Sequence, residues 1–330
     1  MQRTPGEGVS SATAVVETHG LGKRYGTIEA LADLDLRVPE RSIFGLLGPN
    51  GAGKTTAMKL LVGLAAPTSG GGLIFGRDIV DDSTEIRKRV GFLAQEPRFY
   101  EHQSARETLR FTARFFYTGP ERAIDERVEE ILELVGLADR ADRAIRGFSG
   151  GERQRLGIAQ AQVNRPELLI MDEPAAALDP MGRHAVLSIL ERLRGHTTVV
   201  YSTHILDDVE RVSDHVAILD HGRLVVQAPT QELLSGDGAL TYVLRLSRPH
   251  AMLAHTLSAL PWVVGVTEER TDGGGQTLFV GVDDEAAADA QLLRLALAEP
   301  DVVVSEFRRR AFDLEEVFLG LVGTRREEAA

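Results

Sequence analysis

Hydrophobic and polar residues recur with different periods along this chain, and each period predicts a type of secondary structure. From Val15 onward, apolar residues occupy every second position in VVETHGLGKRYG and again in ALADLDLRV, which predicts antiparallel strands. Residues 42–48 (SIFGLLG) form a short apolar stretch that ends in Gly-Pro-Asn-Gly, as a buried central strand would. A helix is predicted to follow over residues 54–64, with Pro67 beyond its end.

The middle of the chain changes to helical spacing. Between residues 104 and 161, apolar residues recur three or four positions apart, for example Ile124, Val128, Ile131, Leu132 and Val135. This spacing predicts an α-helical insertion. Short apolar runs with helical segments between them then return, which is typical of a mainly parallel sheet. These runs cover residues 168–171, 198–203 and 215–219. The first part of the chain is therefore predicted to be an α/β domain with an antiparallel β section and a helical insertion.

A second, smaller domain is predicted after the linker sequence LSGDGA near residues 235–238. Its pattern is strand, helix, strand, strand, helix, strand, the order of an α+β ferredoxin-like unit. The strands are expected at residues 240–246, 263–267, 277–282 and 302–307, and the helices at 250–260 and 285–298. An amphipathic helix capped by Asp313 is expected over residues 313–323. The predicted divisions are a disordered tail at 1–13, a first domain at 14–236 and an accessory domain at 237–330.

Composition and charge narrow the possible classes of protein. The 330 residues are 43% hydrophobic and 26% charged, as in an ordinary folded protein, and the net charge of −12 opposes binding to nucleic acid. The absence of cysteine excludes disulfides, cysteine–zinc sites and thiol chemistry. No stretch reaches the ~18 consecutive apolar residues of a membrane-spanning helix, and the first residues lack the apolar core of a signal peptide. We therefore expect a cytoplasmic protein, and any role at a membrane would be peripheral, through contact with a protein that spans it.

The strongest chemical motif is a phosphate-binding loop between the predicted strand at 42–48 and the predicted helix at 54–64. Glycines let the backbone turn its N–H groups toward phosphate, the lysine supplies a positive charge to the outer phosphates, and the threonine offers a hydroxyl to Mg²⁺. A chance glycine-rich turn is the alternative, but the position between strand and helix favours a functional loop. The loop consists of Gly48, Pro49, Asn50, Gly51, Ala52, Gly53, Lys54 and Thr55.

Two carboxylates follow the buried strand predicted at residues 168–171. Open α/β sheets bind their ligands at the carboxyl ends of strands, where Asp172 and Glu173 lie. Asp172 is expected to hold Mg²⁺, and Glu173 is expected to polarise the water that attacks the γ-phosphate. The alternative is an acidic pair that caps the next helix, and for this motif alone that alternative is the stronger one.

Together with Phe148-Ser149-Gly150-Gly151-Glu152, these two motifs resemble the nucleotide-binding domain of the ABC ATPase superfamily, over about residues 15–235. In that family the signature, matched here by Ser149, Gly150 and Gly151, opens a helix that faces the γ-phosphate bound by the opposite protomer. From the residues alone, Ser-Gly-Gly followed by the helical ERQRLGIAQAQV also predicts a helix end that faces an anion.

The resemblance implies roles for further residues, each of which would be weak evidence of function if taken alone. It implies that Tyr25 stacks on adenine, that Gln95 links Mg²⁺ to the transporter interface, and that Asp179 lies where protomers meet. It also implies that His204 is the switch histidine that contacts the γ-phosphate. Thr56, which follows the phosphate-binding loop, is expected to bind the nucleotide as well. Taken alone, a Tyr or Gln of this kind is more often a surface residue, and such a His is usually structural.

Two departures from the family pattern concern affinity rather than catalysis. Glu152 stands where the family more often has Gln and is expected to place a negative charge near the nucleotide bound by the other protomer. Ala175-Ala176-Ala177 replaces a more polar segment and is expected to weaken contacts across the dimer. Neither change removes a catalytic group.

The function implied is that of a MgATP-hydrolysing subunit that pairs as a head-to-tail homodimer, or with a second ABC subunit. It would drive a separately encoded integral membrane permease from the inner face of the cell membrane. Residues 313–323 (DLEEVFLGLVG) resemble the tail of daunorubicin-type export subunits, which favours export of drug-like or lipid-like compounds. The alternatives are the ATPase of an importer, a nucleotide switch that barely hydrolyses, and a soluble ABC ATPase that acts on ribosomes or nucleic acid.

The soluble alternative is disfavoured by the single cassette, the acidic charge, and the absence of zinc motifs and long coiled-coil heptads. Intact Glu173 and His204 disfavour a switch. Residues 308–310 (Arg-Arg-Arg) are interpreted as a solvated run at a strand end in preference to a patch for a partner or lipid headgroup. The sequence identifies neither the cargo nor the permease, nor the task of the second domain.

Overall fold

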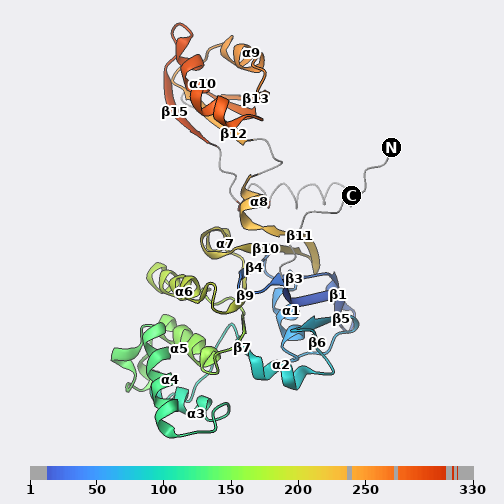
Figure 1. The fold of residues 1–330 in the computed structure, drawn as a ribbon, viewed down its shortest axis with the longest axis vertical. Coiled ribbons are helices and arrows are strands. Elements are labelled where there is room, and N and C mark those ends of the chain that lie inside the picture. Colours follow the sequence, from blue (N-terminus) through green and yellow to red (C-terminus); the bar gives the residue numbers. More distant parts are fainter. Residues whose placement is uncertain (1–12, 236–239, 271–273, 310–313, 316–317, 319–330) are drawn as a thin grey trace. The chain divides into compact units, whose positions relative to one another are not determined.

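In the computed structural model the chain divides into two units, Met1–Thr230 and Gln231–Ala330 (Figure 1). The structure describes residues 13–235, 240–270, 274–309, 314–315 and 318. The tail predicted at 1–13 therefore lies outside the described residues except for Thr13, as do most of the linker and most of the helix predicted over 313–323.

The first unit begins with the predicted antiparallel section. Strand β1 lies between β2 and β5, and every pairing in this sheet is antiparallel. Alternate residues such as Leu34, Leu36 and Val38 are buried while the residues between them are exposed, which explains the period of two in the sequence. The strands are β1 (Ala14–Tyr25), β2 (Ile28–Leu34), β3 (Arg37–Pro39), β5 (Ser69–Ile74) and β6 (Arg77–Asp78).

A six-stranded sheet forms the centre of the unit, in the order β11-β10-β4-β9-β8-β7. All neighbours are parallel except β11, which pairs antiparallel with β10 at the edge. Strands β4, β8 and β9 are buried along their whole length, as their continuous apolar sequences predicted. The strands are β4 (Ile43–Leu47), β7 (Val90–Leu93), β8 (Leu168–Met171), β9 (Thr198–Thr203), β10 (His215–Asp220) and β11 (Arg223–Pro229).

The register of this sheet brings strand ends together. Leu47 of β4 pairs with Thr203 of β9, while Met171 of β8 pairs with Tyr201 of β9 and with Leu93 of β7. Since all four strands run in the same direction, the segments that follow them leave the sheet at one edge.

Helices connect these strands and also form the predicted insertion, which Figure 1 shows as the green group α3, α4 and α5. Apolar residues of α4 spaced three or four apart, such as Ile124, Val128 and Ile131, are buried in one cluster with Leu156 of α5. The insertion contains α3 (Ala105–Ala113), α4 (Glu121–Leu134), α5 (Gly150–Gln162) and the 3₁₀ turns η1 (Ala138–Arg140) and η2 (Ile145–Gly147). The connecting helices are α1 (Lys54–Leu61), α2 (Ser83–Arg89), α6 (Pro180–Leu193) and α7 (Leu206–Val212), and α8 (Thr230–Ser235) follows β11.

The second unit contains the six predicted elements in the predicted order. Its antiparallel sheet has the order β13-β14-β12-β15, and Tyr242, Leu278 and Leu292 lie in its core. Helix α9 is shorter than predicted, and the His250 imidazole accepts the Leu253 N–H where it begins. The elements are β12 (Leu240–Leu246), α9 (Leu253–Ser258), β13 (Val263–Arg270), β14 (Gln276–Val282), α10 (Glu285–Ala298) and β15 (Val304–Arg309).

Candidate active site

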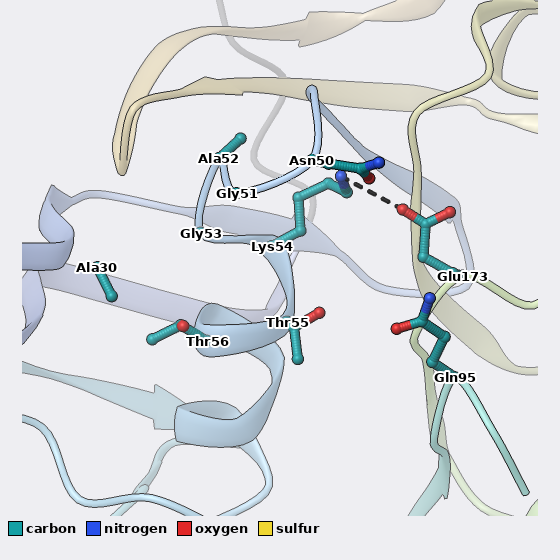
Figure 2. A pocket seen from close by; sticks show the side chains of 10 residues that line it. All are labelled: Ala30, Asn50, Gly51, Ala52, Gly53, Lys54, Thr55, Thr56, Gln95 and Glu173. Atoms are coloured by element: carbon teal, nitrogen blue, oxygen red, sulfur yellow. Dashed lines mark ion pairs between the residues drawn. The ribbon is translucent and has the colours of Figure 1, made fainter. Parts of the chain in front are cut away.

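The loop between β4 and α1 wraps around a pocket of about 510 Å³ (Figure 2). Two of its glycines are required by their surroundings. A Cβ on Gly48 would lie 2.3 Å from the Leu219 carbonyl oxygen, and one on Gly53 would lie 2.7 Å from the Ala30 carbonyl oxygen. Gly53 also has φ of 100°, which L residues rarely adopt, and it is the N-cap of α1. The pocket is lined by Ala30, Asn50, Gly51, Ala52, Gly53, Lys54, Thr55, Thr56, Gln95 and Glu173.

Lys54 extends from the first turn of α1 into this pocket. Its ammonium donates to the carbonyl oxygens of Gly48 at 2.7 Å and Pro49 at 3.1 Å. It also lies 3.3 Å from Glu173 Oε1, the ion pair drawn in Figure 2, and only 6% and 7% of the two side chains are exposed. The ammonium of Lys54 and the carboxylate of Glu173 therefore form a buried ion pair in this pocket.

The two carboxylates after β8 face the loop rather than a helix end. Asp172 Oδ1 accepts a hydrogen bond from the Thr55 hydroxyl at 3.1 Å, and Glu173 Oε2 lies 2.9 Å from Nδ1 of His204. The alternative interpretation, an acidic pair that caps the next helix, is wrong because Asp179 caps α6. The ends of β4, β8 and β9 thus bring together five residues from three segments that lie far apart in the sequence.

Ser202 is a buried member of this site that the sequence analysis missed. Its hydroxyl donates to Asp172 Oδ1 at 2.7 Å and accepts the backbone N–H of Glu173 at 2.8 Å, and its side chain is fully buried. The signal was present in the sequence TVVYST, because a polar side chain inside a buried strand needs a hydrogen-bonding partner.

Gln95 and the oxygen-bearing side chains opposite it form a set of hard donors. Gln95 follows β7 and lines the pocket with Thr55, and Figure 2 shows its amide on the same side as Glu173. Amide, hydroxyl and carboxylate oxygens, the last from Asp172, are the ligands that Mg²⁺ prefers when substrate phosphates complete its coordination. Among the described residues there is no cluster of three or more His, Cys, Asp and Glu residues that could hold a metal alone. The hydroxyl of Thr55, the amide of Gln95 and the carboxylate of Asp172 fit a magnesium ion whose remaining ligands are phosphate oxygens.

The Ser149-Gly150-Gly151 segment begins α5 and is not part of the pocket lining. Ser149 is the N-cap, and its hydroxyl accepts the Glu152 N–H at 3.3 Å while Glu152 Oε2 accepts the Ser149 N–H at 2.7 Å. This capping box fixes the start of the helix. A Cβ on Gly150 would have no other atom within 4 Å, so the helix end is open toward its surroundings.

Glu152 does not present a free negative charge. Its Oε1 lies 2.5 Å from Nη1 of Arg140, and the residue is buried. Burial raises the pKa of the Glu152 carboxyl, but the hydrogen bonds from Ser149 and the charges of Arg140 and Arg143 outweigh it, so the pKa is lowered. The negative charge of Glu152 is therefore balanced by Arg140 within the chain.

Two more of the predicted residues lie away from the pocket. Tyr25 ends β1 with 47% of its surface exposed, and the ammonium of Lys23 lies 5.0 Å from the centre of its ring. Asp179 is exposed, and its carboxylate accepts the Gly182 N–H at 2.6 Å as the cap of α6. Neither residue lines the pocket of this chain.

The fold and the pocket define a P-loop nucleotide-binding cassette. A family model described as ABC transporter matches residues 31–176. The chain is 36% identical to the daunorubicin/doxorubicin resistance ATP-binding protein DrrA of Streptomyces peucetius, over 94% of this chain and 93% of DrrA. It is also 36% identical to the Nod factor export ATP-binding protein I of Cupriavidus metallidurans, over 94% of this chain and 98% of that protein.

A solved structure gives the same class. The dimeric post-hydrolysis state of the ATP-binding cassette MJ0796, bound to ADP and Pi, superposes with a TM-score of 0.60 at 26% identity, covering 65% of this chain and 98% of that one. The chain therefore belongs to the family of ABC transporter ATP-binding proteins, and it is an ATPase. In the described part of the chain, no helix is long and apolar enough to cross a membrane.

Proposed function

We propose that this chain is the MgATP-hydrolysing subunit of an exporter for drug-like or lipid-like compounds, and that it drives a separately encoded membrane permease. The observation that supports hydrolysis is the convergence of Lys54, Thr55, Asp172, Glu173 and His204 at one edge of the sheet. Export is supported by the two relatives described above, whose similarity extends over nearly the whole chain and so includes the second unit.

The geometry supports a distinct role for each group. Lys54 and the N–H groups of the loop bind the β- and γ-phosphates, and α1 adds the positive end of its dipole. Thr55, Gln95 and Asp172 hold Mg²⁺, which neutralises charge on the phosphate oxygens. Glu173 orients the attacking water and accepts its proton.

His204 has two contacts in this proposal. Its Nδ1 lies 2.9 Å from one oxygen of Glu173, and its ring is half-exposed. We propose that the exposed part of the ring contacts the γ-phosphate. Catalysis of phosphoryl transfer depends mainly on such positioning and on electrostatic stabilisation. The catalytic residues proposed are therefore Glu173, His204 and Lys54.

The remaining predicted residues support a shared site. Ser149, Gly150 and Gly151 lie at an open helix end outside the pocket, so we propose that they bind the γ-phosphate held by a second copy. The copies pair head to tail, as a homodimer or with a second ABC subunit, and Asp179 lies at their contact. Tyr25 stacks on adenine.

The second unit is proposed to be a ferredoxin-like accessory domain at residues 237–330, after an ATPase domain at 14–236. Its strand order β13-β14-β12-β15, with helices after the first and third strands, supports that assignment. The whole protein is proposed to lie on the inner face of the cell membrane, bound to its permease. No binding of nucleic acid is expected, because the net charge is −12.

Mixing two inactive variants tests whether the sites are shared. Glu173→Gln disables a site in the chain that holds the nucleotide, while Gly150→Asp adds a repelling carboxylate at the helix end that the opposite copy uses. The Asp side chain has free space and favours the helix dipole, so the fold is retained. In an equal mixture half the dimers are mixed, and each contains one intact site.

Phosphate release from this mixture is expected to recover to roughly a quarter of the wild-type rate, as follows from random pairing in a two-fold dimer. Each variant alone is the control and should be nearly inactive. A mixture that is no more active than the variants alone would contradict a site shared between copies.

A further inference from the structure

Ser202 connects the two acidic residues of the site to a different strand. Its hydroxyl donates a hydrogen bond to Asp172 Oδ1 at 2.7 Å and accepts one from the backbone N–H of Glu173 at 2.8 Å. The Ser202 side chain is fully buried, and Asp172 and Glu173 are only 4% and 6% exposed, so solvent does not compete for these bonds. One hydroxyl therefore fixes a carboxylate and the adjacent peptide together.

The peptide that Ser202 holds has an uncommon conformation. Glu173 has φ of 49°, in the left-handed region that residues other than glycine rarely adopt. This backbone turns the side chain of Glu173 toward Lys54 and His204, which contact its two carboxylate oxygens. Since His204 lies two residues after Ser202, the end of β9 contacts Glu173 at both its backbone and its carboxylate.

We propose that Ser202 is a positioning residue for ATP hydrolysis: it sets the orientation of the Glu173 carboxylate and of the Asp172 oxygen together, without touching the substrate. This inference rests on the proposed function of Glu173 and Asp172. It assigns to Ser202 an effect on the rate of the chemical step and little effect on nucleotide binding, because the loop and Lys54 bind the phosphates independently of it.

Replacing Ser202 with Ala tests this role by removing one buried hydroxyl. The expected result is a fall in kcat of about tenfold or more, with KM for ATP within about twofold of wild type, since partners that orient site ligands typically contribute 10- to 100-fold. The measurements are steady-state phosphate release and nucleotide binding on the full chain. Ser202→Cys, which keeps a weak donor of similar shape, is expected to give an intermediate kcat.

Tyr201→Phe is the matched control. It removes another buried hydroxyl from the adjacent position of β9, where successive side chains point to opposite faces of the sheet. That hydroxyl bonds to the Asp208 carbonyl and to the Ser213 hydroxyl, away from the pocket. We expect both variants to lower the temperature of unfolding to a similar extent, and only Ser202→Ala to lower kcat.

Three results would overturn the inference. The first is a Ser202→Ala kcat that falls no further than that of Tyr201→Phe, and the second is a loss expressed in KM alone. The third is a kcat of Ser202→Cys equal to that of the wild type. This result can be obtained even if the Ala variant does not fold. If Glu173→Gln retained wild-type turnover, the proposed function of Glu173 would fail first, which distinguishes the two failures.

Discussion

Replacing Glu173 with Gln is expected to lower ATP turnover by about 10²- to 10⁴-fold, the range that a general base contributes. The amide keeps the shape of the side chain but does not accept the proton of the attacking water. ATP binding should be retained or strengthened, because Lys54 loses the carboxylate that lies 3.3 Å away and is left with a full charge for the phosphates. Phosphate release and nucleotide binding, measured on the same preparation, check both parts.

A matched control lies at the opposite end of the same strand. Glu167 immediately precedes β8 and forms hydrogen bonds of 2.6 Å with Arg89, remote from the pocket. Glu167→Gln makes the same chemical change, removes an exposed ion pair and should leave turnover within about twofold, because exposed pairs contribute little. If Glu173→Gln turned over ATP as fast as this control, Glu173 would not be the base.

Replacing Lys54 with Ala is expected to weaken MgATP binding by about tenfold to a hundredfold, because a hydrogen bond to a charged group contributes about 1.5–3 kcal/mol. The variant also leaves the buried carboxylate of Glu173 without its cation, and that negative charge repels the phosphates. Turnover at saturating ATP should also fall sharply. Titration of the nucleotide by calorimetry measures the affinity directly.

The control for this variant is Lys59→Ala on the same helix. Lys59 lies in the last turn of α1 and is exposed, so removing its charge changes the net charge equally without changing the pocket. Its affinity for MgATP should match that of the wild type. Equal affinity in Lys54→Ala would show that the loop backbone alone binds the phosphates.

The boundaries of secondary-structure elements were predicted best where the hydrophobic pattern was continuous or strictly periodic. The apolar runs at 168–171 and 198–203 are the strands β8 and β9 to the residue, and 285–298 is α10. These segments are bounded by polar or helix-breaking residues that mark their ends. In contrast, the edge strand β11 was not predicted, because its residues are mostly half-buried and lack a clear period.

The site was predictable as a set of motifs but not as a set of contacts. Lys54, Asp172 and Glu173 stand in motifs whose chemistry follows from residue type and spacing. The bond between Ser202 and Asp172 depends on the register of β8 against β9, which no local pattern in the sequence specifies. The pairing of Glu152 with Arg140 likewise depends on how η1 packs beside the start of α5, and it balances the negative charge that the sequence alone suggested to be unpaired.

We propose above that this ATPase drives a permease encoded by another chain. The most direct measurement is to express tagged Glu173→Gln protein in the organism that encodes it, trap it with ATP, and purify it from solubilised membranes and from cytosol. Mass spectrometry then identifies what co-purifies. We expect one membrane protein with several spanning segments to co-purify in stoichiometric amount. Recovery of ribosomal proteins or nucleic acid instead would contradict this proposal.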